Sequence, residues 1–207
     1  MCSRRRWGAS LDAGNLDEAV RYCLIAIDVG TAAIRQPVLT YAFTNLAQAY
    51  TLDGKTQLAR EQLEAARNWN LHERSWRVDV AFLCENANIA LMQGNVPLAL
   101  QQVELLERLV SGREHAVPER PVFAKLRIFR TAYIAGDDCA WDLAQGELKL
   151  FPDHCTTYYL TLLAVVAWLE RRRQGECTRE TRRELSVLDE VGARGLKAIL
   201  TAEGFLT

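Results

Sequence analysis

Residues 39–69 read LTYAFTNLAQAYTLDGKTQLAREQLEAARNW, and this stretch decides the fold. Apolar residues recur at helical spacing before Gly54, where Ala47 marks one face, and after it, where Ala59 and Leu63 mark another. Glycine adopts the left-handed backbone that ends a helix at low cost. Small residues on the facing sides let two helices approach closely. The stretch therefore predicts a helical hairpin that turns at Gly54.

The hairpin pattern repeats along the chain. Glycines that end one helical pattern and open the next are separated by steps of 40, 40, 42 and 39 residues. They are Gly14, Gly54, Gly94, Gly136 and Gly175. The fifth unit turns polar in its second helix, where Glu180 and Glu184 stand at otherwise apolar offsets, and a polar terminal unit is typical of a capped repeat array.

These repeats predict an all-α fold, an α-solenoid of about five antiparallel hairpins in one domain that covers 1–207. Four of the five prolines fall between the proposed hairpins or at the start of one, and Pro97 falls in the first turn of a helix, where proline is tolerated. No strand-like alternation of useful length appears. The predicted hairpins cover 3–29, 38–69, 75–111, 120–150 and 155–191, and a short capping helix covers 194–203.

The repeat pattern resembles that of tetratricopeptide repeat (TPR) proteins. The second unit carries Leu46-Ala47-x-x-Tyr50-x-x-x-Gly54, with Ala59 and Ala66 following. The period is near 40 rather than about 34 residues, no proline closes the second helix, and the usual tryptophan of the first helix is absent. Variants of this length are similar to sensor and effector regions of bacterial regulators, including maltose-regulator-like activators and peptide-responsive Rap-type proteins. The resemblance implies a right-handed superhelix whose first helices line a concave groove.

Composition excludes several partner classes. The 25 basic and 26 acidic residues nearly cancel, so no global field attracts nucleic acid or an anionic membrane. The most apolar run, Tyr158 to Leu169, is far shorter than the roughly 20 residues that cross a bilayer, and no signal-peptide core follows the basic N-terminus. The six cysteines contain no CxxC pair, which favours a reducing compartment. We expect a soluble, cytoplasmic protein with no direct nucleic-acid or membrane partner.

The resemblance also implies which residues would meet a ligand, namely those of the first helices that are not needed for packing within a hairpin. The candidate ligand-binding residues are Tyr41, Asn45, Gln48, Glu85, Asn88, Met92, Phe123, Arg127 and Arg130.

Their chemistry suits a peptide. The three amides each donate and accept hydrogen bonds, as the backbone of an extended peptide requires. Arg127 and Arg130 are neighbours on one helix face and together suit a carboxylate. Tyr41, Met92 and Phe123 supply apolar pockets. The same polar residues are equally typical of any solvent-facing helix surface, on which Glu85 and the other acids simply neutralise nearby arginines.

Catalytic and metal-binding patterns are absent from the sequence. The chain has no GxGxxG, GxxxxGK[ST], GxSxG or HExxH motif. His72 and His115 fall in predicted loops, and the adjacent pair His154-Cys155 has no second ligand pair at zinc spacing. Asp137-Asp138 is typical of a helix start. We expect no enzyme activity, no cofactor and no metal.

Arginine clusters have structural explanations. Those at 171–173 and 179–183 alternate with glutamates such as Glu170, which predicts pairing within helices. Arg4–Arg6 begins the first hairpin without an acidic partner, as expected if the chain is a fragment or if another segment covers this end. An uncapped end of a solenoid exposes apolar surface and favours homo-oligomers.

The most economical hypothesis is a non-catalytic protein- or peptide-binding module. It would serve as a regulatory or sensor domain in bacterial signalling or transcription control and bind through the concave groove. Two alternatives stay open. One is a homodimerising structural adaptor. The other is a regulatory domain that binds a small molecule between Tyr41, Met92, Phe123 and Tyr133.

Overall fold

The computed structural model describes residues 15–32, 36–70, 75–113, 120–149, 157–190, 193–202 and 204–206. Almost all of these residues are helical, and none of them lies in a strand, so the all-α prediction is confirmed. The helices are α2 (Leu16–Ala32), α3 (Gln36–Leu52), α4 (Thr56–Asn70), α5 (Trp76–Met92), α6 (Val96–Val110), α7 (Arg120–Ile134), α8 (Asp137–Lys149), α9 (Thr157–Gln174), α10 (Arg179–Leu185), α11 (Val187–Glu190) and α12 (Arg194–Ala202).

The predicted helix pairs are present from the second unit onwards. Helices α3 and α4, α5 and α6, and α7 and α8 fill the second, third and fourth units. The first helix of the first unit lies outside the described residues. In the fifth unit, the second helix is broken at Ser186 into α10 and α11. The Ser186 hydroxyl donates to the Arg183 carbonyl at 2.6 Å, a local bond that competes with the regular helix.

Glycines make the hairpin turns, as predicted. Gly54, Gly94, Gly136 and Gly175 have φ of 72°, 67°, 94° and 85°. In the second unit, the Lys55 amide donates to the Tyr50 carbonyl at 2.8 Å. This hydrogen bond is typical of a helix that ends at a left-handed glycine, here Gly54.

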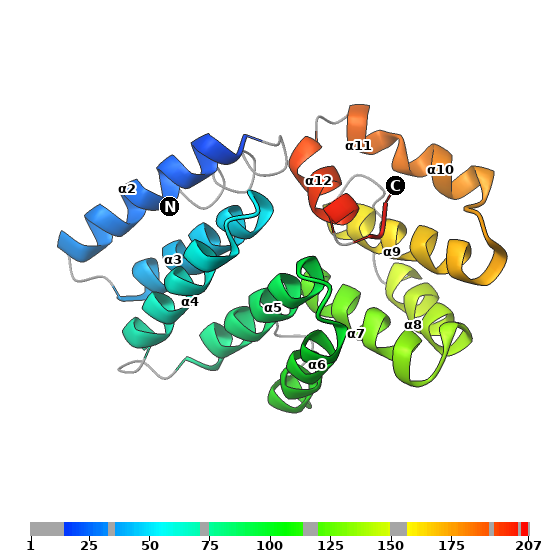
Figure 1. The fold of residues 1–207 in the computed structure, drawn as a ribbon, viewed down its shortest axis with the longest axis horizontal. Coiled ribbons are helices and arrows are strands. Elements are labelled where there is room, and N and C mark those ends of the chain that lie inside the picture. The colour runs from blue at the N-terminus through cyan, green and yellow to red at the C-terminus, as the bar shows by residue number, and fades with distance from the viewer. Residues whose placement is uncertain are drawn as a thin grey trace.

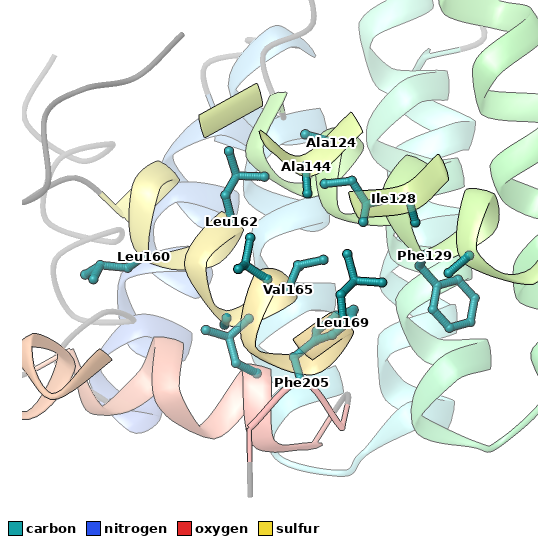
Figure 2. Packing of buried hydrophobic residues seen from close by; sticks show 14 of the residues in the cluster. Ala124, Ile128, Phe129, Ala144, Leu160, Leu162, Val165, Leu169 and Phe205 are labelled. Atoms are coloured by element: carbon teal, nitrogen blue, oxygen red, sulfur yellow. The ribbon is translucent and has the colours of Figure 1, made fainter. Parts of the chain in front are cut away.

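The helices of each pair, and each pair and its neighbours, bury a shared apolar interior. Ala47, Ala59 and Leu63 are at most 1% exposed, which confirms the predicted seam, and they pack with Ile89 of the next unit. A second cluster joins α5 and α6 to α7, and the largest joins α7, α8, α9 and α12 (Figure 2). Phe205, beyond α12, belongs to this largest cluster.

The first helices of the pairs contact one another in sequence, α3 with α5, α5 with α7, and α7 with α9. Helix α12 contacts both α3 and α9, although these two helices are more than 100 residues apart in the chain. Figure 1 shows α12 between α3 on one side and α9 on the other. The chain therefore returns at its C-terminal side to a helix near its beginning.

Arg172 and Arg173 of α9 pair with aspartates of α8 rather than with glutamates of their own helix, which corrects the prediction of intrahelical pairing for these two residues. Glu170 is 4% exposed and accepts hydrogen bonds from the Thr178 amide at 2.9 Å and the Thr181 hydroxyl at 3.0 Å. Its carboxylate thereby fixes the turn from α9 to α10. Arg172 binds Asp137 of α8 at 3.0 Å instead of a glutamate on its own helix.

The turn geometry yields a paired prediction. Gly136→Ala forces a side chain into a left-handed backbone and should lower the free energy of unfolding by about 1–2 kcal/mol. Gly146 lies within α8, and a Cβ added there would meet no atom within 4 Å of another part of the structure. Gly146→Ala should therefore raise the free energy of unfolding by about 0.5–1 kcal/mol. Urea denaturation followed by circular dichroism measures both. Equal shifts of the same sign in the two variants would contradict the assigned role of Gly136.

Candidate functional site

A buried polar cluster joins α5 to α7. The ammonium of Lys125 donates to Oδ1 of Asn88 at 3.2 Å, and Nδ2 of Asn88 donates to Oε1 of Glu85 at 3.4 Å. The exposed fractions are 2% for Lys125, 6% for Asn88 and 7% for Glu85. Charges this far from solvent require opposite charges and hydrogen bonds nearby. Two of the predicted residues are therefore linked to a lysine that is not among them, Asn88 directly and Glu85 through Asn88.

The C-terminal segment, residues 193–202 and 204–206, lies against this cluster. Phe205 is 1% exposed, and the centroid of its ring lies 5.8 Å from Nζ of Lys125. The same ring meets Trp168 of α9 edge-on, with 5.4 Å between centroids. The Arg171 guanidinium donates to the carbonyl oxygen of Phe205. Glu85, Asn88, Lys125 and Phe205 are called the Lys125 cluster below.

Local backbone chemistry turns Phe205 inward. Gly204 has φ of 78°, which ends α12. The amides of Phe205 and Leu206 then donate to the Leu200 carbonyl at 2.8 Å and 3.0 Å. Leu200 is fully buried, so the turn and the apolar face of α12 anchor the segment together.

The two predicted arginines lie elsewhere on α7. Nη1 of Arg130 lies 2.8 Å from Oε2 of Glu107 on α6, and Arg127 lies 3.9 Å from both Glu107 and Glu147 of α8. Arg127 also lies over the ring of Phe123, 5.4 Å from its centroid. The four charged residues are called the arginine cluster. They are neighbours, as the spacing predicts, but protein carboxylates already face both guanidinium groups.

Phe123 is 3% exposed and belongs to the apolar cluster between α5, α6 and α7. Tyr41, Asn45 and Gln48 form a half-buried stripe on α3, at spacings of four and three residues. Within the described part of the chain, the side chains of Asn45 and Gln48 make no hydrogen bond. Met92 is half-buried at the end of α5.

Lys125 and Phe205 are not among the predicted residues, but the sequence contains a signal for each of them. Lys125 shares a helical stripe with Ile128 and Ala132, both buried, so it interrupts an otherwise apolar face. Phe205 follows Gly204, and an apolar residue directly after a C-terminal glycine commonly folds back on its helix.

Among the described residues, no group of three His, Cys, Asp or Glu side chains is placed to hold a metal ion. The three histidines and Cys155 lie outside the described residues. Asp137 and Asp138 stand in the first turn of α8, as predicted, and bind Arg172 and Arg173 at 3.0 Å and 2.8 Å.

The described thiols differ in environment. Cys23 is 3% exposed, and burial raises the pKa of its thiol to about 12. Cys139 is exposed at the start of α8. Cys177 is half-buried, its thiol donates to the Ala167 carbonyl at 3.1 Å, and burial is the main cause that raises its pKa.

Comparison with protein-family models, with curated proteins and with solved structures found no match to this chain. Across the residues that the structure describes, no helix combines the length and the apolar character that a membrane span requires.

The Lys125 cluster predicts a large effect on stability. Lys125→Met removes the cation from a buried site that holds Glu85, and should lower the free energy of unfolding by about 2–4 kcal/mol. Adding Glu85→Gln should restore part of the loss, whereas adding Glu107→Gln from the arginine cluster should not. Urea denaturation measures all three variants. An unchanged stability of Lys125→Met would contradict the cluster.

The thiols predict an order of alkylation. In the folded protein at pH 8, iodoacetamide should modify Cys139 well before Cys23. Only the thiolate reacts, and burial raises the pKa of the Cys23 thiol to about 12, so that it is almost entirely protonated at pH 8. Peptide mass spectrometry after timed quenching measures both sites, and the same reaction in guanidinium chloride provides the unfolded control. Equal rates at Cys139 and Cys23 in the folded protein would refute the burial of Cys23.

Proposed function

We propose that this chain is a right-handed solenoid of TPR-like hairpins that acts as a non-catalytic module for protein or peptide binding. Its role would be regulatory, in bacterial signalling or transcription control. The regular order of helix pairs and the successive contacts between their first helices support the solenoid. Each pair touches mainly its neighbours, so a ligand that spans several first helices would bias small rotations between pairs.

The observation that carries the proposal is that the first helices already bind a polypeptide segment of the same chain. Phe205 inserts its ring beside Lys125 and Trp168, and its backbone carbonyl accepts from Arg171. An aromatic side chain in a pocket together with a main-chain hydrogen bond is the ordinary chemistry of peptide recognition. The side of α7 and α9 that holds this segment therefore suits polypeptide.

A partner would bind most readily on α3, next to the part covered by the C-terminal segment. Asn45 and Gln48 are half-buried and have no hydrogen-bond partner among the described residues, so their amides are available to a peptide backbone. Tyr41 lies on the same stripe and would add an apolar contact.

The arginine cluster suits an acidic partner less well. A carboxylate of the partner would have to compete with Glu107, which lies 2.8 Å from Arg130, and with Glu147 beside Arg127. Both arginines are largely covered, with side-chain exposures of 31% for Arg127 and 24% for Arg130. We therefore rank Asn45 and Gln48 above the arginines as partner contacts.

One observation favours the homodimer as a second candidate. Three apolar residues on α2, Leu24, Ile25 and Val29, are 48%, 52% and 59% exposed. A cluster of exposed apolar side chains on one helix is typical of a surface that pairs with another protein. Sedimentation equilibrium over a range of concentrations distinguishes a stable dimer from a monomer and accompanies the partner experiment.

The partner experiment uses affinity capture from a lysate of the source organism with matched double variants. Asn45→Ala/Gln48→Ala should lose the captured partner, because it removes two amides from the α3 stripe. The control Asn68→Ala/Gln101→Ala removes the same residue types from exposed positions on α4 and α6 and should retain it. A partner held equally by both variants would exclude the α3 stripe. Absence of any partner, together with a concentration-dependent mass, would favour the homodimer.

A further inference from the structure

The C-terminal segment is attached to the rest of the molecule through one face. Leu196 and Leu200 of α12, four residues apart, are 5% and 0% exposed, and Phe205 follows at 1%. All three belong to the apolar cluster of α7, α8 and α9. Lys197 and Thr201, on the other side of the helix, are exposed. The segment thus has the form of an amphipathic peptide bound to a surface of other helices.

The pocket that holds the Phe205 ring is built from parts that other contacts keep in place. Lys125 donates to Asn88 of α5 at 3.2 Å. The ring of Trp168 lies beside that of Phe129 on α7, with 6.0 Å between centroids. Since neither contact involves the C-terminal segment, we expect these walls to persist when the segment leaves. A pocket that is formed in advance costs less free energy to occupy.

The segment itself is held less firmly than the helices around it. Helix α12 has nine residues, and a helix of fewer than about 12–15 residues is marginal on its own in water. Its exposed ion pair, Lys197 with Asp189 at 3.0 Å, contributes little. The conformational entropy lost when the segment becomes ordered offsets much of the free energy gained by burying its three apolar side chains. We therefore expect the segment to open more readily than α9.

We propose that the C-terminal segment is an exchangeable internal ligand, and that its pocket receives an aromatic residue of a partner protein when the segment opens. The partner segment that fits has the same form, a short amphipathic helix followed by glycine and an aromatic residue. Its ring takes the place of Phe205 beside the Lys125 ammonium and Trp168, and its backbone carbonyl accepts from Arg171. An aliphatic residue lacks both ring interactions.

This exchange rests on the proposed function, because it assigns a partner chemistry and a form of regulation to the same binding module. The partner's apparent affinity is limited by the fraction of molecules whose own segment is open. The α3 stripe is a separate surface.

A synthetic peptide of residues 193–207, labelled with fluorescein, tests the exchange by fluorescence anisotropy against the full-length protein. The Phe205→Ala protein should bind this peptide about tenfold or more tightly than the wild type does, because its own segment no longer fills the pocket. A peptide that carries Phe205→Leu should bind the same protein about threefold to tenfold more weakly, since it lacks the ring interactions. A peptide that carries Thr201→Ser, on the exposed face, should bind like the parent peptide.

A matched variant separates an emptied pocket from a general loosening of the core. Val103 of α6 is 0% exposed and belongs to the cluster between α5, α6 and α7, which does not include the C-terminal segment. Val103→Ala therefore weakens a core without emptying the Phe205 pocket, and its affinity for the peptide should equal that of the wild type. A circular dichroism melt of each variant establishes that it folds.

Hydrogen exchange in the wild-type protein measures the opening without any substitution. Amides of residues 198–202 in α12 should exchange at least tenfold faster than those of residues 162–169 in α9, a helix of the same apolar cluster. Exchange of both stretches at one rate would mean that the segment opens only when the protein unfolds. That result would overturn the proposal even if Phe205→Ala does not fold.

Three binding results would also overturn it. They are an unchanged affinity of Phe205→Ala for the peptide, an equal gain in Val103→Ala, and equal binding of the Phe205→Leu peptide. None of them bears on the α3 stripe, whose test is the loss of a captured partner in Asn45→Ala/Gln48→Ala. Failure of the exchange and failure of the α3 stripe can thus be told apart.

Discussion

A two-helix hairpin is too small to bury both of its apolar faces, and most of the structure follows from this constraint. Leu63 of α4 packs on α3, and the same cluster already includes Ile89 of the next pair. Phe123 of α7 likewise enters the interior of the pair before it. The left-handed glycine turns keep each pair antiparallel, so every hairpin offers its second apolar side to a neighbour. Stability is therefore shared between adjacent pairs rather than held within any one of them.

Buried polar groups then restrict how the pairs fit together. Lys125 meets Asn88 across the contact between α5 and α7, and both are almost completely covered. A shift of α7 by one turn would separate them and leave a buried ammonium without this hydrogen bond, at a cost of several kcal/mol. Apolar surfaces alone would tolerate such a shift more readily, because leucine and alanine contacts are less directional.

The sequence predicted what depends on local periodicity and missed what depends on the rotation of one helix against another. Helix pairs, the glycine turns and the seam of Ala47, Ala59 and Leu63 follow from spacing within about 30 residues. Asn88 and Arg130 stand six residues before Gly94 and Gly136, so the repeat gives them equivalent positions. In the structure, Asn88 faces α7 whereas Arg130 faces Glu107 of α6. The repeat period carries no information about that difference, which arises from packing between units.

Displacing the C-terminal segment costs free energy, which lowers the affinity of any partner that binds in its place. A partner that took the place of Phe205 would first have to break the Arg171 hydrogen bond and expose a ring that is 1% accessible. Burial of a phenylalanine side chain contributes about 1.5–3 kcal/mol, so the apparent affinity would fall by roughly tenfold or more relative to an open site. The α3 stripe carries no such penalty, because Asn45 and Gln48 have no hydrogen bonds to lose among the described residues. Since α12 contacts α3 as well as α9, a ligand that displaced α12 from either helix would also loosen the segment.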